Sequence, residues 1–172
     1  MSWADFYRRR DAIDQVLAHA RRHQTARLPF DELAAARVFD SRDELALALQ
    51  YRWSCLLTGR LAVALADAGR TQDADHVDAV AAAWRTTARQ HPELRRLLDN
   101  HAKVGDAEFR AALRAEQRMV AHAAGLADAD EPADETARIG AAFLMLVRGT
   151  PERPMRRANP IEQLFRRLVA SN

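Results

Sequence analysis

The side chains of this sequence that could do chemistry are few, and they lie far apart. His19 and His23 are spaced i, i+4, so both imidazoles would lie on one face of a helix and could fill two positions around a metal ion. A di-iron bundle would also need carboxylate–histidine repeats on other helices, and the sequence contains none. Because histidines on an arginine-rich surface are usually solvated, we predict no metal and no cofactor.

The sequence also offers no recognisable catalytic group. Cys55 is the single cysteine, and we interpret it as a small core residue, because a nucleophile would need a base and an exposed, electropositive site. Glu116 and His122 fall on one amphipathic helix, but nothing in the pattern pairs them as an acid and a base. We therefore predict that the chain is not an enzyme.

Aromatic residues on three of the predicted helices suggest binding instead of catalysis. The candidate ligand-binding residues are Tyr51, Trp53, Trp84, Phe109, Met119 and His122. They could line an apolar pocket in which His122, Arg52 or Gln117 orients the ligand. Plain packing of a hydrophobic core accounts for the same residues, and the sequence leaves both interpretations open.

Composition and charge narrow the range of partners. The 172 residues carry a net charge of +2, and this near-neutral balance is only weak evidence for nucleic acid binding despite a pI of about 9.2. Basic clusters at 8–10 and 153–157 are interpreted as solvated surfaces, because the second has no interleaved aromatic residue to stack on bases. No apolar run is long enough to span a bilayer, and Met1 is followed at once by a charged helical pattern. With a single cysteine, these features predict a cytoplasmic protein with no membrane partner.

The elements that would position these residues are all helical. Apolar residues recur at helical spacing, and there is no strand pattern, glycine-rich loop or internal repeat. The predicted helices cover residues 2–24, 30–38, 41–69, 72–90, a short stretch from Pro92, 106–124, 133–148 and 160–170. The fold class is therefore predicted to be all-α, with about seven helices around one long central helix.

The central helix is predicted to run from a cap at Ser41 to a left-handed glycine at Gly69. Glu44 follows Ser41 by three residues, which is the pattern of a capping box. Apolar residues occur on nearly every face, which is typical of a helix surrounded by others. Small residues at spacings of four, three and four would admit a neighbouring helix closely: Cys55, Gly59, Ala62 and Ala66.

Residues 39–45, Phe-Asp-Ser-Arg-Asp-Glu-Leu, resemble the join between the DNA-binding head and the first core helix of TetR-family regulators. The run from Ala83 to Leu94, a long helix interrupted at Pro92, is similar to the ligand-binding domain of that family. The resemblance implies a helical head over residues 1–40 and an orthogonal bundle for ligand binding and dimerisation over 41–172.

The head departs from that family in length. A TetR head needs three helices before the position of Phe39, and only residues 34–39 remain for the turn and the recognition helix together. This span also lacks the turn glycine and the hydroxyl side chains that contact phosphates and bases in a helix-turn-helix. Sequence-specific DNA reading is therefore not expected.

The last two predicted helices each carry an apolar stripe, and the resemblance assigns them to a dimerisation pair. Gly140, Ala141 and Ala142 would let another helix approach closely. A symmetric dimer would bury both stripes in a four-helix bundle. The predicted interface residues are Ala142, Phe143, Leu146, Leu164, Phe165 and Leu168.

Three functional hypotheses follow. The first is a TetR-like regulatory module that forms a homodimer and binds a small apolar or amphipathic ligand without reading DNA. The second is a DNA-binding repressor with a compacted head. The third is a helical adaptor for a protein partner. The sequence does not identify the ligand, the operator or the partner.

Overall fold

The computed structural model describes residues 3–70 and 75–149, and within them every regular element is helical. The elements are α1 (Trp3–His23), η1 (Ala34–Arg37), α2 (Arg42–Ala68), α3 (His76–Gln90), α4 (Pro92–His101), α5 (Ala107–Ala123) and α6 (Ala133–Gly149). The all-α prediction is confirmed. The described part contains six α-helices and one 3-10 helix, close to the seven expected, while the predicted helix over 160–170 lies outside the described residues.

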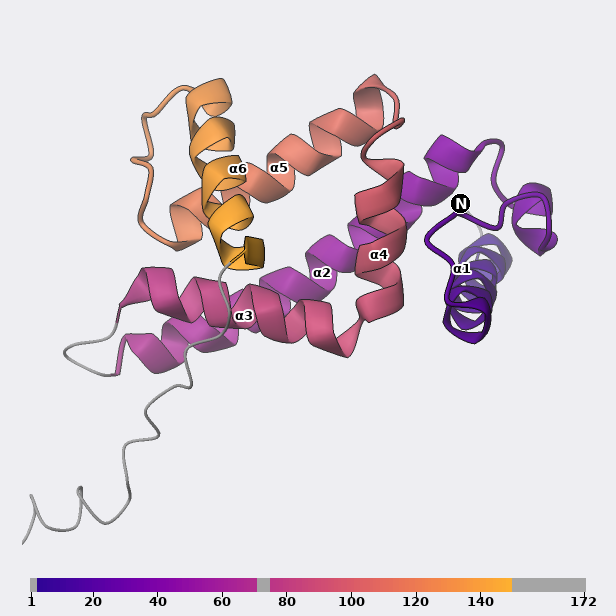
Figure 1. The fold of residues 1–172 in the computed structure, drawn as a ribbon, viewed down its shortest axis with the longest axis horizontal. Helices are drawn as coiled ribbons and strands as arrows, with labels where there is room; N and C mark the ends of the chain where they lie inside the picture. The colour runs from indigo at the N-terminus through magenta and orange to yellow at the C-terminus, as the bar shows by residue number, and fades with distance from the viewer. Residues whose placement is uncertain (1–2, 71–74, 150–172) are drawn as a thin grey trace, which may run out of the picture.

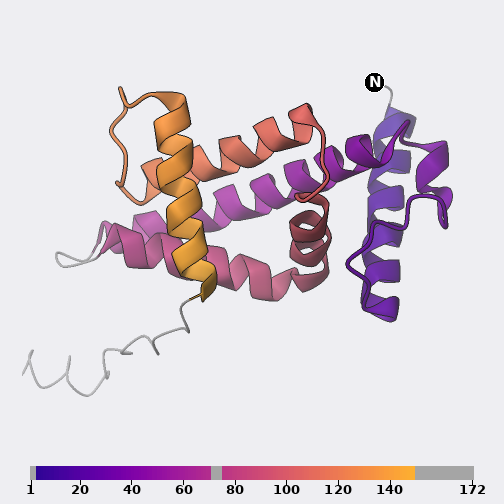
Figure 2. The same ribbon diagram turned by 45° about the horizontal axis from the view of Figure 1, so that its top comes forward.

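The helices cross one another in two main directions. α2 and α3 form an antiparallel hairpin, and α5 packs along α2 (Figure 1). α6 crosses over α5 and α3, while α4 turns the chain from α3 back to α5 (Figures 1 and 2). α1 lies at one end of the molecule, against α4, η1 and α2. Within the described ranges no helix is both long enough and apolar enough to cross a membrane.

Local capping signals set where most helices begin. The Ser41 hydroxyl accepts the Glu44 N–H at 3.0 Å, as predicted for the start of α2. In a capping box the Glu44 carboxylate would also accept the N–H of Ser41. This part of the prediction is wrong, because the carboxylate instead accepts the N–H of Asp40 at 2.6 Å and pairs with Arg9 at 2.6 Å. This arrangement ties the start of α2 to α1 rather than closing on Ser41 alone.

Three other boundaries depend on single residues. Asp106 caps α5 by accepting the Phe109 N–H at 2.8 Å, and Pro92 occupies the first turn of α4, as predicted. The Asp75 carboxylate caps α3 by accepting the Val77 N–H at 2.8 Å, whereas the start predicted at residue 72 lies outside the described residues. The left-handed glycine predicted at Gly69 is wrong, since its φ is −63°.

The predicted helix over residues 30–38 shrinks to the four-residue 3-10 turn η1. Leu33, the residue before η1, has extended backbone angles and offers no side-chain cap, so no α-helix is nucleated there. Phe39 after it is buried, and the Arg9 guanidinium lies 4.5 Å from the centre of its ring. The segment between α1 and α2 is therefore a largely exposed loop that is held to the core by buried residues such as Ala35 and Phe39.

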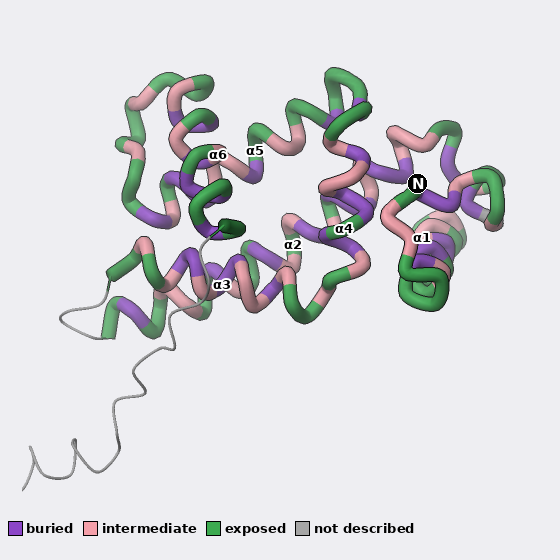
Figure 3. The backbone as a smooth tube through the Cα atoms, in the orientation of Figure 1, coloured by how far each residue is buried: buried purple, intermediate pink, exposed green. Residues whose placement is uncertain are grey.

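α2 provides much of the core but is not enclosed on every side (Figure 3). Leu45, Leu49, Trp53 and Leu57 are fully buried, because α3, α4 and α5 all pack on the same side of α2. The prediction that a neighbouring helix packs along the small-residue stripe is wrong, because no described helix covers the stripe. Its members are all exposed: Cys55, Gly59, Ala62 and Ala66. The interpretation of Cys55 as a core residue is wrong for the same reason.

The close helix–helix approach occurs instead at Gly140 on α6. A Cβ at this position would lie 1.9 Å from the carbonyl oxygen of Gln117, so α6 can sit on α5 only with glycine there. Gly140 therefore serves a contact between two helices of the same chain.

Candidate functional site

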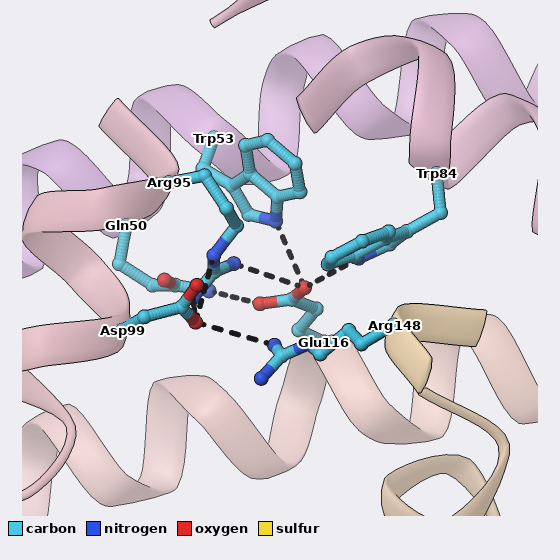
Figure 4. A network of polar contacts seen from close by, with 7 residues as sticks. All are labelled: Gln50, Trp53, Trp84, Arg95, Asp99, Glu116 and Arg148. Carbon is cyan, nitrogen blue, oxygen red and sulfur yellow. Dashed lines mark hydrogen bonds and ion pairs between the residues drawn. The ribbon is translucent and has the colours of Figure 1, made fainter. Parts of the chain in front are cut away.

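The centre of the helical core holds a carboxylate from α5 (Figure 4). Glu116 is 3% exposed. Its Oε1 accepts the indole N–H of Trp53 at 2.9 Å and that of Trp84 at 3.3 Å, while its Oε2 accepts the Gln50 amide at 2.8 Å. Side chains from α2 and α3 thus converge on one acidic group, which would be very costly to bury without such partners.

Arg95 on α4 supplies the balancing positive charge. Its Nη1 lies 3.4 Å from Glu116 Oε1, its Nη2 lies 2.9 Å from Asp99, and its guanidinium lies 4.8 Å from the centre of the Trp53 ring. Asp99 also faces Arg148 of α6 at 3.4 Å, as Figure 4 shows. The core cluster, defined as Gln50, Trp53, Trp84, Arg95 and Glu116, is therefore electrostatically linked to the surface through Asp99.

One polar atom of the core cluster lacks a partner. Gln50 is 1% exposed, and its Oε1 accepts no hydrogen bond from any described residue. Buried oxygens of this kind normally receive a hydrogen bond from the protein, from water or from a ligand. The donors around Glu116 hold its carboxylate in a fixed orientation, and Arg95 balances the negative charge of that carboxylate.

Helical periodicity could have revealed Glu116. The residues Phe109, Leu113 and Val120 form the inward face of α5, and Glu116 falls between them on the same stripe. A charged residue inside an apolar stripe signals a buried, paired group. Arg95 carries the same signal, because it lies between buried leucines on α4.

Two of the predicted ligand-binding residues meet in the core. Trp53 and Trp84 pack edge to face, with ring centroids 5.8 Å apart. Phe109 is buried as well, but its ring packs against His101 at 4.8 Å, near the start of α5. The tryptophans therefore belong to the core cluster, whereas Phe109 packs with a different neighbour.

The other three predicted ligand-binding residues lie closer to the surface. Met119 is half-buried, and its sulfur accepts a hydrogen bond from Thr58 at 3.3 Å. His122 is exposed. Tyr51 is 74% exposed, and a hydrogen bond with Cys55 raises the pKa of its hydroxyl. The structure does not gather the six predicted residues around one space.

The predicted dimer residues on α6 divide between two faces. Phe143 is only 7% exposed and packs into the core of the chain itself, whereas Ala142 is exposed. Leu146 is 68% exposed and its neighbour Met145 is 72% exposed. The remaining predicted interface residues, Leu164, Phe165 and Leu168, lie outside the described residues.

The histidine pair of α1 is close enough for ring contact. The rings of His19 and His23 have centroids 4.3 Å apart, and His19 Nε2 lies 3.3 Å from a carboxylate oxygen of Glu32. Residues 3–70 and 75–149 contain no group of three or more histidine, cysteine, aspartate or glutamate side chains arranged to hold a metal ion.

Two further surface features were not predicted. The first turn of α1 exposes three aromatic rings that contact one another: Trp3, Phe6 and Tyr7. The second feature is a pair of adjoining hollows beside α4, with volumes of about 490 and 400 Å³. Arg95 lines the larger hollow, so this hollow reaches the edge of the core cluster.

Comparison of the chain with protein-family models, with curated proteins and with solved structures gave no match.

Proposed function

We propose that this chain is a homodimeric, all-α regulatory module that binds a small amphipathic ligand and does not itself read a DNA sequence. The observation that carries the proposal is the core cluster. In this cluster Glu116 accepts from two tryptophans, and the Gln50 amide bonded to the same carboxylate has an oxygen without a partner among the described residues. A few oriented polar groups inside an apolar shell are typical of small-molecule sites. A ligand with an apolar body and one donor group would satisfy Gln50 Oε1.

The proposal that the chain does not read DNA is supported by how little helix the connection between α1 and α2 contains. Within it the structure places the 3-10 turn η1, four residues long, followed by the buried Phe39. A recognition helix must present several side chains to base edges in the major groove, and a single 3-10 turn is too short for that. The regulatory role itself follows from the TetR resemblance of residues 39–45.

Tryptophan fluorescence tests ligand binding. Trp3 is exposed, so the Trp3→Phe variant leaves only Trp53 and Trp84 as reporters. In this variant, dodecanoate and a hydrophobic naphthalene-sulfonate dye should shift or quench the emission and raise the melting temperature. A ligand at a hundred times its Kd should stabilise the fold by roughly 2.7 kcal/mol.

The matched control keeps a tryptophan only at position 3, away from the core cluster. A Trp53→Phe, Trp84→Phe double variant retains only Trp3 and should show no saturable response. If both variants respond equally, the probes bind the surface nonspecifically and the proposal fails.

A helical adaptor for a protein partner is the second candidate, and the aromatic rings on α1 favour it. Trp3, Phe6 and Tyr7 are exposed together, and Arg10 lies over the Tyr7 ring at 4.8 Å. Tryptophan, tyrosine and arginine dominate the energetics of protein interfaces. A Trp3→Ser, Tyr7→Ser variant that loses a stable complex formed by the wild type, with its thermal stability unchanged, would favour this candidate.

A further inference from the structure

The two hollows beside α4 adjoin each other. The larger has a volume of about 490 Å³ and the smaller about 400 Å³, and both are lined by Ala26 and Asn100. Most of the lining residues come from α4, the residues just after it and the segment that follows α1, and the start of α2 and Ala88 of α3 supply the rest. We call this feature the α4 groove.

Positive charge is concentrated in the α4 groove. With histidine counted as neutral, five cations line it against two carboxylates, Asp43 and Asp99. The cations are Arg27, Arg42, Arg95, Arg96 and Lys103. This local excess of positive charge is larger than the net charge of +2 on the whole chain. The groove should therefore attract anions.

Three of these cations have no side-chain partner in the part of the chain that the structure describes. Arg95 is paired with Glu116 and Asp99, and Arg42 is paired with Asp31. In contrast, Arg27, Arg96 and Lys103 are exposed and form no side-chain ion pair or hydrogen bond with another described residue. Arg96 and Lys103 line the larger hollow, and Arg27 lines the smaller one, so the free charges serve both halves of the groove.

The shape and walls of the groove favour a small molecule over a nucleic acid. Each hollow falls within the range of roughly 300 to 1,000 Å³ that is usual for small-molecule sites. Ala26, Ala88 and Pro92 provide apolar wall for the body of a ligand. The one aromatic ring among the described residues that line the groove is that of His101, which is buried and packs against Phe109, so the groove offers no exposed ring on which single-stranded bases could stack.

We propose that the α4 groove binds a small anion with two acidic groups, phosphate or carboxylate. Arg96 and Lys103 hold one acidic group, and Arg27 holds the other. Asn100, which lines both hollows, supplies a hydrogen bond between them. This site is separate from the exposed face of α6 and does not depend on the homodimer. It borders the core cluster through Arg95, whose guanidinium lies over Trp53.

Calorimetric titration with pyrophosphate and with citrate tests the proposal and separates phosphate from carboxylate chemistry. At least one anion should bind with a stoichiometry of one per chain, more weakly as salt rises. The Arg96→Gln, Lys103→Gln double variant should lose at least about tenfold in affinity, since each charge-assisted hydrogen bond is strong. Lys103→Arg keeps the charge and should retain most of the affinity.

The control variant removes two positive charges, as the test variant does, but from a different helix. Arg114 and Arg118 on α5 form no ion pair with another described residue and do not line the groove, so Arg114→Gln with Arg118→Gln should leave binding unchanged. All variants should keep the wild-type circular dichroism. Equal losses in the two double variants would show diffuse charge attraction and overturn the proposal.

Chemical protection gives an independent readout, because Lys103 is the only lysine of the chain. A bound anion should slow acylation of Lys103 by a soluble ester, followed by peptide mass, and should leave acylation of the α-amino group unchanged. If neither anion gives saturable binding or protection, or if a thymidine 20-mer binds the groove tightly while both anions fail, the small-anion site is wrong.

Discussion

Among the single residues of this protein, Glu116 has the most demanding position. It occupies a place on α5 that the helical period assigns to an apolar side chain, yet it is 3% exposed. A carboxylate at such a site is tolerated only when donors surround it. Arg95 and the three neutral donors of the core cluster meet that need, so the packing of α2, α3, α4 and α5 depends on one charged group.

Removing this charge should destabilise the protein without opening a large cavity. Glu116→Gln keeps the shape but leaves Arg95 with Asp99 as its only carboxylate partner, and an amide cannot accept from every donor now present. We expect the free energy of unfolding to fall by about 2–4 kcal/mol in urea titrations. Exposed Glu108 on the same helix is the control, and Glu108→Gln should cost less than about 0.5 kcal/mol. Equal, small effects would show that the core cluster is not needed for stability.

Glu44 should make the stability depend on pH in the acid range. The Asp40 N–H, which donates to Glu44, holds the pKa of this carboxyl below its ordinary value of 4.5; Arg9 acts in the same direction, and partial burial opposes both. The folded state therefore binds this proton more weakly than the unfolded state. The stabilisation is fully present above pH 4.5 and is lost as the pH falls through the lowered pKa.

The test compares wild type with Glu44→Gln across that range. At neutral pH the variant should be less stable by about 1 kcal/mol, and the difference should shrink when the pH falls below the ordinary carboxyl pKa. Urea unfolding followed by circular dichroism at several pH values measures it. A difference that stays constant down to the most acidic sample would mean that Glu44 is protonated equally in both states.

At the scale of elements, local signals were predictable and signals that depend on neighbours were not. The caps at Ser41 and Asp106 and the proline at Pro92 act within one helical turn, so the sequence was sufficient to place them. The small-residue stripe of α2 was misjudged, because only the tertiary arrangement shows which face of a helix has a neighbour. Gly69 is an exception among the local signals, because its backbone stays right-handed helical and not left-handed. Small residues on a helix permit close approach but do not choose the partner.

Two mid-helix glycines provide a matched pair of predictions. Gly140 lies against the backbone of Gln117, so Gly140→Ala forces α6 away from α5 and should destabilise the protein by about 2–3 kcal/mol. Gly59 faces open space, so Gly59→Ala should stabilise the fold by about 0.5–1 kcal/mol through better helix propensity. Thermal and urea unfolding of both variants would check these signs. A destabilised Gly59→Ala would reveal that something covers this face of α2 in solution.

For the whole molecule, the helical class was predictable from periodicity, whereas the location of the polar centre was not. Trp53 and Trp84 were identified from their residue types, and they do meet in the core. Tyr51 and His122 were placed with them because their types suit a pocket, but both are exposed. The sequence shows which residues can line a site, and the crossing angles of the helices decide which of them meet.

The last prediction concerns assembly, and α6 allows a clean separation of two effects. Phe143 faces the protomer's own core, so Phe143→Asp should unfold the protein whether or not it dimerises. Leu146 points outward and is 68% exposed, so Leu146→Asp should leave the helical circular dichroism intact. In sedimentation at micromolar concentration, the wild type should be a dimer and Leu146→Asp a monomer, because a dimer would have to bury this charge.

Val63 is the matched control, since it is an exposed apolar residue on a different helix, α2. Val63→Asp should remain dimeric if the interface is formed by α6. If Val63→Asp dissociates the dimer and Leu146→Asp does not, the contact between copies runs along the exposed face of α2 instead. A wild type that sediments only as a 19.3 kDa monomer would rule out both interfaces and would leave Met145 and Leu146 available to another partner.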